Sequence, residues 1–244
     1  MEIPVEIKSG LRLLKRVPLG LALRLLTFYF ARKVLALPAT LSFSQTGEDR
    51  VLSFYLPEQS GFYVDVGAND PLRLSSSFIF YMKGWRGIAI DANEVLVNRF
   101  RRTRKQDICV VAAVSDSERD VIFHRSDSHA VSTIDNATYQ AWQRRWKFRP
   151  ENQVELRTRT LTSILQMALP DQAIKIDFLS IDVEGHEFQV LSGLDFSLYR
   201  PRMIAVEIHD LESIFSSRIY HLLSQKRYSL VGYVTMNAYF ADSL

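Results

Sequence analysis

The chain has 244 residues, of which 47% are hydrophobic and 23% charged, a composition that is typical of globular proteins and excludes a disordered chain. Its net charge of +3 is uneven, because residues 1–40 carry seven basic and two acidic side chains and the rest of the chain has a slight acidic excess, which argues against a nucleic-acid partner. The single cysteine, Cys109, excludes an internal disulfide and favours a reducing, cytoplasmic compartment, and without a cysteine–histidine cluster no structural zinc site is expected.

Residues 1–40 form a basic and apolar extension ahead of the main domain. A helix is expected over Leu19–Leu35, where most side chains are Leu, Phe or Val. Arg24 and two further basic residues interrupt this apolar run, which disfavours both a transmembrane span and a signal peptide. The helix must bury a wide apolar face, so we expect it to dock on its own domain, to lie on a membrane surface as a peripheral contact, or to pack against a partner subunit.

From residue 44 onward, short apolar runs alternate with segments of helical pattern. The expected strands are Phe62–Val66, Gly87–Asp91, Ile108–Val114, Asp177–Val183, Arg202–Ile208, Ser229–Val234 and Ala238–Phe240, and Asp120–His124 can extend the sheet. The expected helices are Ser75–Lys83, Glu94–Lys105, Thr160–Leu169, a helix that starts at Glu187–Leu191, and Leu211–Arg227. Residues 125–153 are polar and aromatic and lack strand periodicity, which indicates an inserted loop or small helices.

Strands that alternate with helices predict βαβ units, and therefore an α/β, doubly wound and mostly parallel sheet of seven strands. The last two strands form a hairpin around Thr235–Asn237, which adds an antiparallel strand near the C-terminus. We therefore expect one domain over residues 41–244 behind the extension.

The first candidate site follows the first expected strand. Asp65 and Gly67 lie where this strand ends, and Asp91 ends the next strand, a place where an acidic residue typically holds ribose hydroxyls. Asn69 and Leu72 occupy the positions at which a dinucleotide fingerprint needs its second and third glycines. A nucleoside without phosphates, of which S-adenosylmethionine is the common example, therefore fits better than a nicotinamide dinucleotide. The alternative is structural, with Asp65 as a helix cap and Asp91 in a solvated turn.

The second candidate site lies at the ends of the fourth and fifth strands. Asp182 and Glu184 follow the fourth strand, and Glu207 and His209 follow the fifth, so that neighbouring parallel strands bring all four to one cleft. His209 is the natural general base for a hydroxyl near neutral pH. Asp182, Glu207 and His209 can instead bind a hard divalent cation, or the cluster can hydrogen-bond a substrate without proton transfer. Glu184 is also placed where a carboxylate suits the start of a helix.

At these residues the sequence resembles the FkbM family of methyltransferases over about residues 42–210. The matching blocks are Ser44–Asp49, Phe62–Pro71, Gly84–Ile88 leading to Asp91, Asp107–Cys109, Ala112–Ser115, Leu179–Glu187, Leu191–Gly193, and Arg200-Pro201 leading to Glu207. Several blocks in the same order make the resemblance specific, whereas any one block would be weak.

The resemblance implies a Rossmann-like class I methyltransferase that transfers a methyl group from S-adenosylmethionine to a hydroxyl of a sugar, glycan or polyketide-like small molecule. The residues expected to contact the cofactor are Asp65, Gly67, Ala68, Asn69, Asp91, Ser115 and Asp182. His209, with Asp182 and Glu184, is the expected catalytic group, and no metal is required by the sequence. Gln45 and Glu48 are expected to fold over the cleft, and the insert to shape the acceptor pocket. The alternative function is a noncatalytic module of the same fold, recruited to a membrane or a glycan-synthesis complex.

Overall fold

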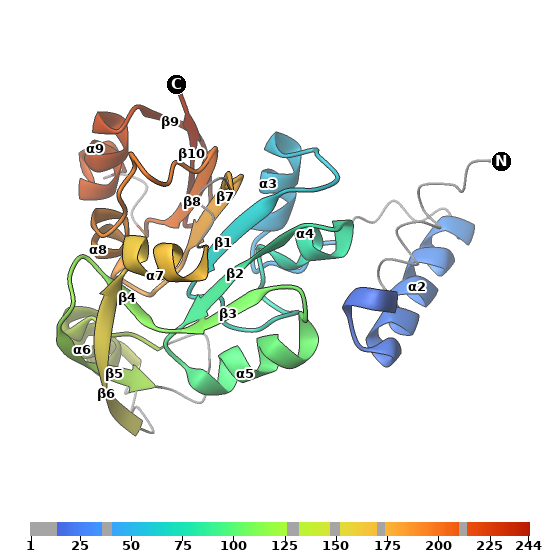
Figure 1. Ribbon diagram of the computed structural model, residues 1–244, viewed down its shortest axis with the longest axis horizontal. Coiled ribbons are helices and arrows are strands. Elements are labelled where there is room, and N and C mark those ends of the chain that lie inside the picture. Colours follow the sequence, from blue (N-terminus) through green and yellow to red (C-terminus); the bar gives the residue numbers. More distant parts are fainter. Residues whose placement is uncertain (1–13, 36–40, 126–131, 147–151, 170–173, 210–213) are drawn as a thin grey trace.

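A computed structural model describes residues 14–35, 41–125, 132–146, 152–169, 174–209 and 214–244 (Figure 1). Its main sheet has seven strands in the order β3-β2-β1-β7-β8-β10-β9. These strands are β1 (Phe62–Val66), β2 (Arg86–Asp91), β3 (Ile108–Val111), β7 (Phe178–Ile181), β8 (Met203–Glu207), β9 (Tyr228–Val234) and β10 (Asn237–Asp242). The first five pair in parallel, and β10 runs antiparallel to both of its neighbours. The expected doubly wound sheet with an antiparallel C-terminal strand is confirmed.

Helices cover both faces of this sheet because its central strands are apolar on both sides. In β1, Val64 and Val66 point to one face and Tyr63 to the other, as the period of two requires. The first face is covered by α7 (Leu161–Ala168), α8 (Glu187–Ser192) and α9 (Arg218–Gln225). The second is covered by α3 (Glu48–Tyr55), α4 (Phe78–Lys83) and α5 (Glu94–Thr103). The chain leaves β1 for β2 and β3 and then returns to β7, so the order reverses between β1 and β7, where such folds bind ligands.

A second sheet of three strands corrects the expectation for residues 108–124. The expected strand Ile108–Val114 breaks at Ala112, whose N–H donates to the carbonyl of Asp91. Only β3 stays in the main sheet, whereas β4 (Ala113–Ser115) pairs with β6 (Asn152–Thr160). The run Asp120–His124 was expected to extend the main sheet; it is instead β5 (Asp120–Arg125), antiparallel to β6.

Strand β6 was not predicted, and its start lies inside the segment expected to lack strands. Residues 153–160 nevertheless alternate in exposure, with the odd-numbered side chains pointing outward. The alternation of Val154, Leu156 and Thr158 with charged residues was the available signal, and the charged side chains concealed it. The remaining described part of the insert contains α6 (Asn136–Trp146), in line with the expected small helices.

Three helices differ from what the sequence predicted. Helix α3 was not predicted at all, and α4 begins at Phe78 rather than Ser75. The expected helix Leu211–Arg227 is divided into a 3₁₀ turn at Ile214–Ser216 and α9, because Ser217 caps α9 by accepting from the N–H of Tyr220. The first part of that expected helix, residues 211–213, lies outside the described residues.

The expected N-terminal helix is present as α2 (Leu19–Val34), which lies beside α4 (Figure 1). Just before it, the guanidinium of Arg16 donates to the carbonyl groups of Tyr81, Gly84 and Trp85 at 2.7–3.0 Å. Val17 and Ala22 are buried in the cluster that α4 shares with the sheet. The described part of the extension therefore docks on the body. Within the residues that the structure covers, no helix has both the length and the apolar character needed to cross a membrane.

Candidate active site

The loop after β1 touches the loop after β7, and Gly67 makes this contact possible. Its φ of +79° lies in the left-handed region. A Cβ at this position would stand 1.7 Å from the backbone oxygen of Asp182. The N–H groups of Gly67 and Ala68 both donate to the carbonyl of Ile90, which ties the same loop to β2. One glycine thus brings the ends of three neighbouring strands together.

Asp91 organises the rim of the site beside this loop. Its two carboxylate oxygens accept from the backbone N–H groups of Asn69 at 3.0 Å and Asn93 at 2.7 Å. Burial raises the pKa of Asp91 to about 6, although these two hydrogen bonds oppose the rise. The Oδ1 atom of Asn69 is buried and accepts no hydrogen bond from the described residues. The rim therefore combines a carboxylate with an unused acceptor.

A pocket of about 830 Å³, counting the space open to solvent, runs along these strand ends. Its apolar walls are formed by Leu96, Val114, Phe123 and Ile134. Of the predicted site residues, it is lined by Gly67, Asn69, Asp91, Asp182 and Glu184, and Gln45 also lines it. One end is therefore apolar and the other acidic.

Three residues predicted to contact the cofactor do not line this pocket. Asp65 accepts a hydrogen bond from Ser77, whose hydroxyl also accepts from the buried guanidinium of Arg104. This contact is close to the structural alternative, in which Asp65 caps the next helix, because Ser77 is the residue that precedes α4. Ala68, in the loop after β1, is buried.

Ser115, the third of these residues, is fully buried at the end of β4. Its Oγ lies 2.9 Å from Nε2 of His186, and His186 does line the pocket. Ser115 therefore contacts a residue that lines the pocket. Direct contact of Asp65, Ala68 and Ser115 with the cofactor stays a prediction.

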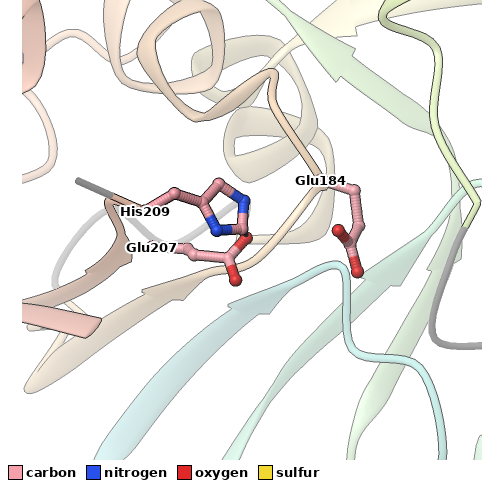
Figure 2. Close-up of side chains that lie close together, drawn as sticks. All are labelled: Glu184, Glu207 and His209. Atoms are coloured by element: carbon pink, nitrogen blue, oxygen red, sulfur yellow. Dashed lines mark ion pairs between the residues drawn. The ribbon is translucent and has the colours of Figure 1, made fainter. Parts of the chain in front are cut away.

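At the acidic end, Asp182 and Glu184 extend the pocket toward Glu207 and His209. Figure 2 shows Glu207 and His209 side by side with Glu184 across from them. One ligand atom of each of these three side chains lies within 4.8 Å of the other two, and Nε2 of His209 is 3.4 Å from Oε2 of Glu207. The predicted second cleft is thus assembled. The trio that could hold an ion contains Glu184, whereas the predicted metal set had Asp182 in that place.

The carboxyl groups of this cleft oppose one another's ionisation. Burial, followed by the charges of Asp182 and Glu187, raises the pKa of Glu184 to about 8. Burial, followed by the charges of Glu184 and Glu187, raises the pKa of Glu207 to about 8. Asp182 is open to the pocket, yet desolvation by the surrounding protein, followed by the charge of Glu207, raises its pKa well above the ordinary value. Such a site favours a ligand that brings positive charge.

Of the two glutamates at the start of α8, Glu187 has the structural role. Its Oε1 accepts from the N–H groups of Val183 at 3.1 Å and Gly185 at 2.9 Å. Glu184 instead has a positive φ of 58°, and its carbonyl accepts from the hydroxyl of Thr133 at 2.8 Å. The insert therefore supports the loop that carries Glu184, a contact for which the sequence holds no signal.

Glu48 lies beside this cleft but faces the protein. Its carboxylate accepts from the N–H and hydroxyl of Thr46 and from the side-chain amide of Asn237 at the start of β10. Burial is the largest single influence and raises the pKa of Glu48, but the hydrogen bonds from Thr46 and other nearby donors hold this pKa below its usual value. Sequence reasoning missed the link to Asn237. Of the pair expected to fold over the cleft, Gln45 reaches the pocket and Glu48 anchors its loop.

Comparison of the sequence with known families identifies the family. A model of the methyltransferase FkbM domain matches residues 65–230, from the end of β1 into β9. The chain belongs to the FkbM methyltransferase family. The matched range covers more than half of the chain and contains both the pocket rim at Asp91 and the acidic cleft. The matched range does not include α2 or the loop that carries Gln45. No protein among the curated sequences matches the chain, and no solved structure does.

Proposed function

We propose that this methyltransferase uses S-adenosylmethionine and methylates a hydroxyl of a sugar, glycan or polyketide-like small molecule. The observation that carries the proposal is the single pocket that joins Asp91, at the end of β2, to the acidic cleft after β7. The first end suits a nucleoside, and the second suits the positive charge of a sulfonium and an ammonium group.

The residues of the pocket fit this cofactor. The carboxylate of Asp91 has free acceptor capacity for ribose hydroxyls, since each oxygen accepts only one backbone hydrogen bond. The orphaned Oδ1 of Asn69 would gain a donor from the ligand, and Leu96 and Phe123 would flank an adenine ring. The cofactor supplies a methyl group that is already activated, so the protein has mainly to align the acceptor with it.

On the acceptor side, His209 is placed to remove the hydroxyl proton. Its side chain is 58% exposed, so an acceptor can reach it, and Glu207 lies close enough to orient the ring. A positioned base of this kind contributes about 10²–10⁴-fold to the rate. Asp182 and Glu184 would hydrogen-bond the other hydroxyls of the acceptor. The described part of the insert, which reaches the pocket at Thr133 and Ile134, would shape the acceptor site.

Isothermal titration with S-adenosylmethionine and S-adenosylhomocysteine tests the cofactor. We expect micromolar binding of both, and at least a tenfold loss in Asp91→Ala. Asp195→Ala is the matched control, because Asp195 is an exposed carboxylate on the loop after α8 and does not line the pocket. Unchanged affinity in Asp91→Ala would show that the pocket has been assigned to the wrong ligand.

A second candidate function rests on the outer surface of α2. Leu19, Leu23, Phe30 and Val34 are all more than half exposed, and at 100° per residue they fall within an arc of about 60°. A protein that keeps the fold for binding could use this stripe to attach to a membrane. Normal binding of S-adenosylmethionine without methyl transfer to any member of a sugar and glycan panel would favour this function, and transfer to one of them would exclude it.

A further inference from the structure

Glu184, Glu207 and His209 have the spacing of ligands that share one metal ion. Glu184 comes from the loop after β7, and Glu207 and His209 come from the end of β8, so two adjacent strand ends supply the donors (Figure 2). One ligand atom from each residue lies within 4.8 Å of the other two. Atoms that bind the same cation at about 2.1–2.4 Å lie about 3–5 Å apart, so the three donors need only small shifts to converge.

The buried carboxylate of Glu207 points to a missing ligand. Its side chain is 8% exposed, and its Oε2 accepts no hydrogen bond from the described residues. A carboxylate oxygen that is removed from water without a donor is costly, and an ion in contact with it would remove that cost. The same oxygen faces Nε2 of His209 at 3.4 Å, which places the orphaned atom on the side where the other two ligands lie.

The surrounding charges favour a cation at this place. Asp182, Glu184 and Glu187 follow β7, and Glu207 ends the adjacent strand β8. Several carboxyl groups at the ends of β7 and β8 therefore repel one another, and a divalent ion between them would relieve that repulsion.

We propose that Glu184, Glu207 and His209 bind one divalent cation. Two carboxylates with one imidazole suit a first-row ion such as Mn²⁺ better than Ca²⁺, which takes oxygen ligands. Three protein ligands leave coordination positions open toward the pocket. The use of those positions to hold the acceptor hydroxyl rests on the proposed function, whereas binding of the ion does not.

Bound metal would also change the role of His209. The lone pair of Nε2 cannot both bind an ion and accept a proton, so this atom can be either a metal ligand or a general base, but not both at once. In the metal-bound protein the cation would lower the pKa of the hydroxyl that it holds. This makes the choice between the two roles an experimental one.

The test is a titration with Mn²⁺ of the full-length protein, from which metal has first been removed with EDTA. Binding is measured as the loss of the electron paramagnetic resonance signal of free Mn²⁺. We expect one saturable site per chain. Glu207→Gln keeps the shape of the side chain and removes its charge, and it should weaken binding at least tenfold, as should His209→Ala. His209 is exposed, so this variant remains informative if Glu207→Gln fails to fold. Glu155→Gln is the control, because Glu155 is an exposed carboxylate on β6.

Two outcomes would overturn the proposal. One is the absence of a saturable Mn²⁺ site, and the other is a site whose affinity is the same in Glu207→Gln, His209→Ala and the unmodified protein. Titration with S-adenosylhomocysteine in EDTA separates this proposal from the proposed function. Cofactor binding without a metal site would contradict only the cation proposal, and a metal site without cofactor binding would contradict only the proposed methyl donor.

Discussion

At the scale of single residues, the buried and pocket-lining carboxyl groups carry the chemistry of this protein. Asp91 is held by two backbone N–H groups and still has acceptor capacity toward the pocket. Asp65, one residue from the end of the adjacent strand, accepts instead from Ser77 and lies outside the pocket. The sequence placed both at strand ends. It could not separate their roles, because the separation depends on where Ser77 and the guanidinium of Arg104 lie in space.

The raised pKa of Asp91 predicts a pH dependence of cofactor binding. With a pKa of about 6, about one carboxyl in ten is ionised at pH 5 and most are ionised at pH 7. Ribose hydroxyls donate to the ionised form, so the affinity for S-adenosylhomocysteine should fall about tenfold from pH 7 to pH 5. Calorimetric titrations at the two pH values measure this fall. The Asp91→Asn variant should bind weakly at both, and an equally steep pH dependence in that variant would assign the effect to another group.

The same pKa has a consequence for stability. Folding raises the pKa of Asp91 above that of the unfolded chain, so the folded protein binds the proton more tightly. The contribution of Asp91 to stability is therefore largest below about pH 4 and is lost as the pH rises through about 6. Bound cofactor would offset this loss by donating to the ionised carboxylate.

At the scale of elements, the ends of β1, β2 and β7 meet at one glycine. The sequence predicted these three strands well because each is a short apolar run with an acidic residue at or next to its end. It predicted the second sheet poorly, because β4 is three residues long and β6 is rich in charged side chains on its exposed face. Pairing between residues 113–115 and 158–160 is a long-range contact that local periodicity does not encode.

The contact at Gly67 predicts a large effect from one methyl group. Gly67→Ala would place a Cβ against the backbone oxygen of Asp182 at a positive φ, and neither loop can yield without moving its strand. We expect a loss of at least about 2 kcal/mol in the free energy of unfolding, together with weaker cofactor binding. Urea denaturation measures the first quantity.

The matched control is Gly20→Ala in α2, where a Cβ meets nothing within 4 Å. Alanine is favoured over glycine inside a helix, so this variant should be as stable as the parent or gain about 0.5–1 kcal/mol. Equal stabilities of Gly67→Ala and Gly20→Ala would contradict the close approach of the two loops.

At the scale of the whole molecule, the basic and apolar N-terminus has one of the roles expected from its sequence, because it docks on its own domain. Arg16, Val17 and Ala22 attach it to the body. The opposite surface of α2 exposes Leu19, Leu23, Phe30 and Val34, as described above. Deleting residues 1–40 would therefore expose part of the core beside α4, and substitutions in the exposed stripe are the better probe of membrane contact.

Replacing Leu19, Leu23 and Phe30 together by Gln should reduce binding to anionic phospholipid vesicles at least fivefold and leave the melting temperature within a few degrees of the parent. The reason is that all three side chains are exposed in the folded protein and would enter the lipid surface. Vesicle sedimentation measures the binding. The control replaces Leu198 and Phe215 by Gln and should bind vesicles as the parent does. Both side chains are exposed near α8 and α9, on the opposite face of the sheet. Equal sedimentation of the stripe variant and the parent would exclude α2 as the lipid contact.

The most direct test of the proposed function is the structure of the protein bound to S-adenosylhomocysteine. The ribose hydroxyls should lie within hydrogen-bonding distance of the Asp91 carboxylate, with the adenine between Leu96 and Phe123 and the sulfur turned toward Asp182. A ligand bound elsewhere, or bound in this pocket without contact to Asp91, would contradict the assignment of this pocket to the methyl donor.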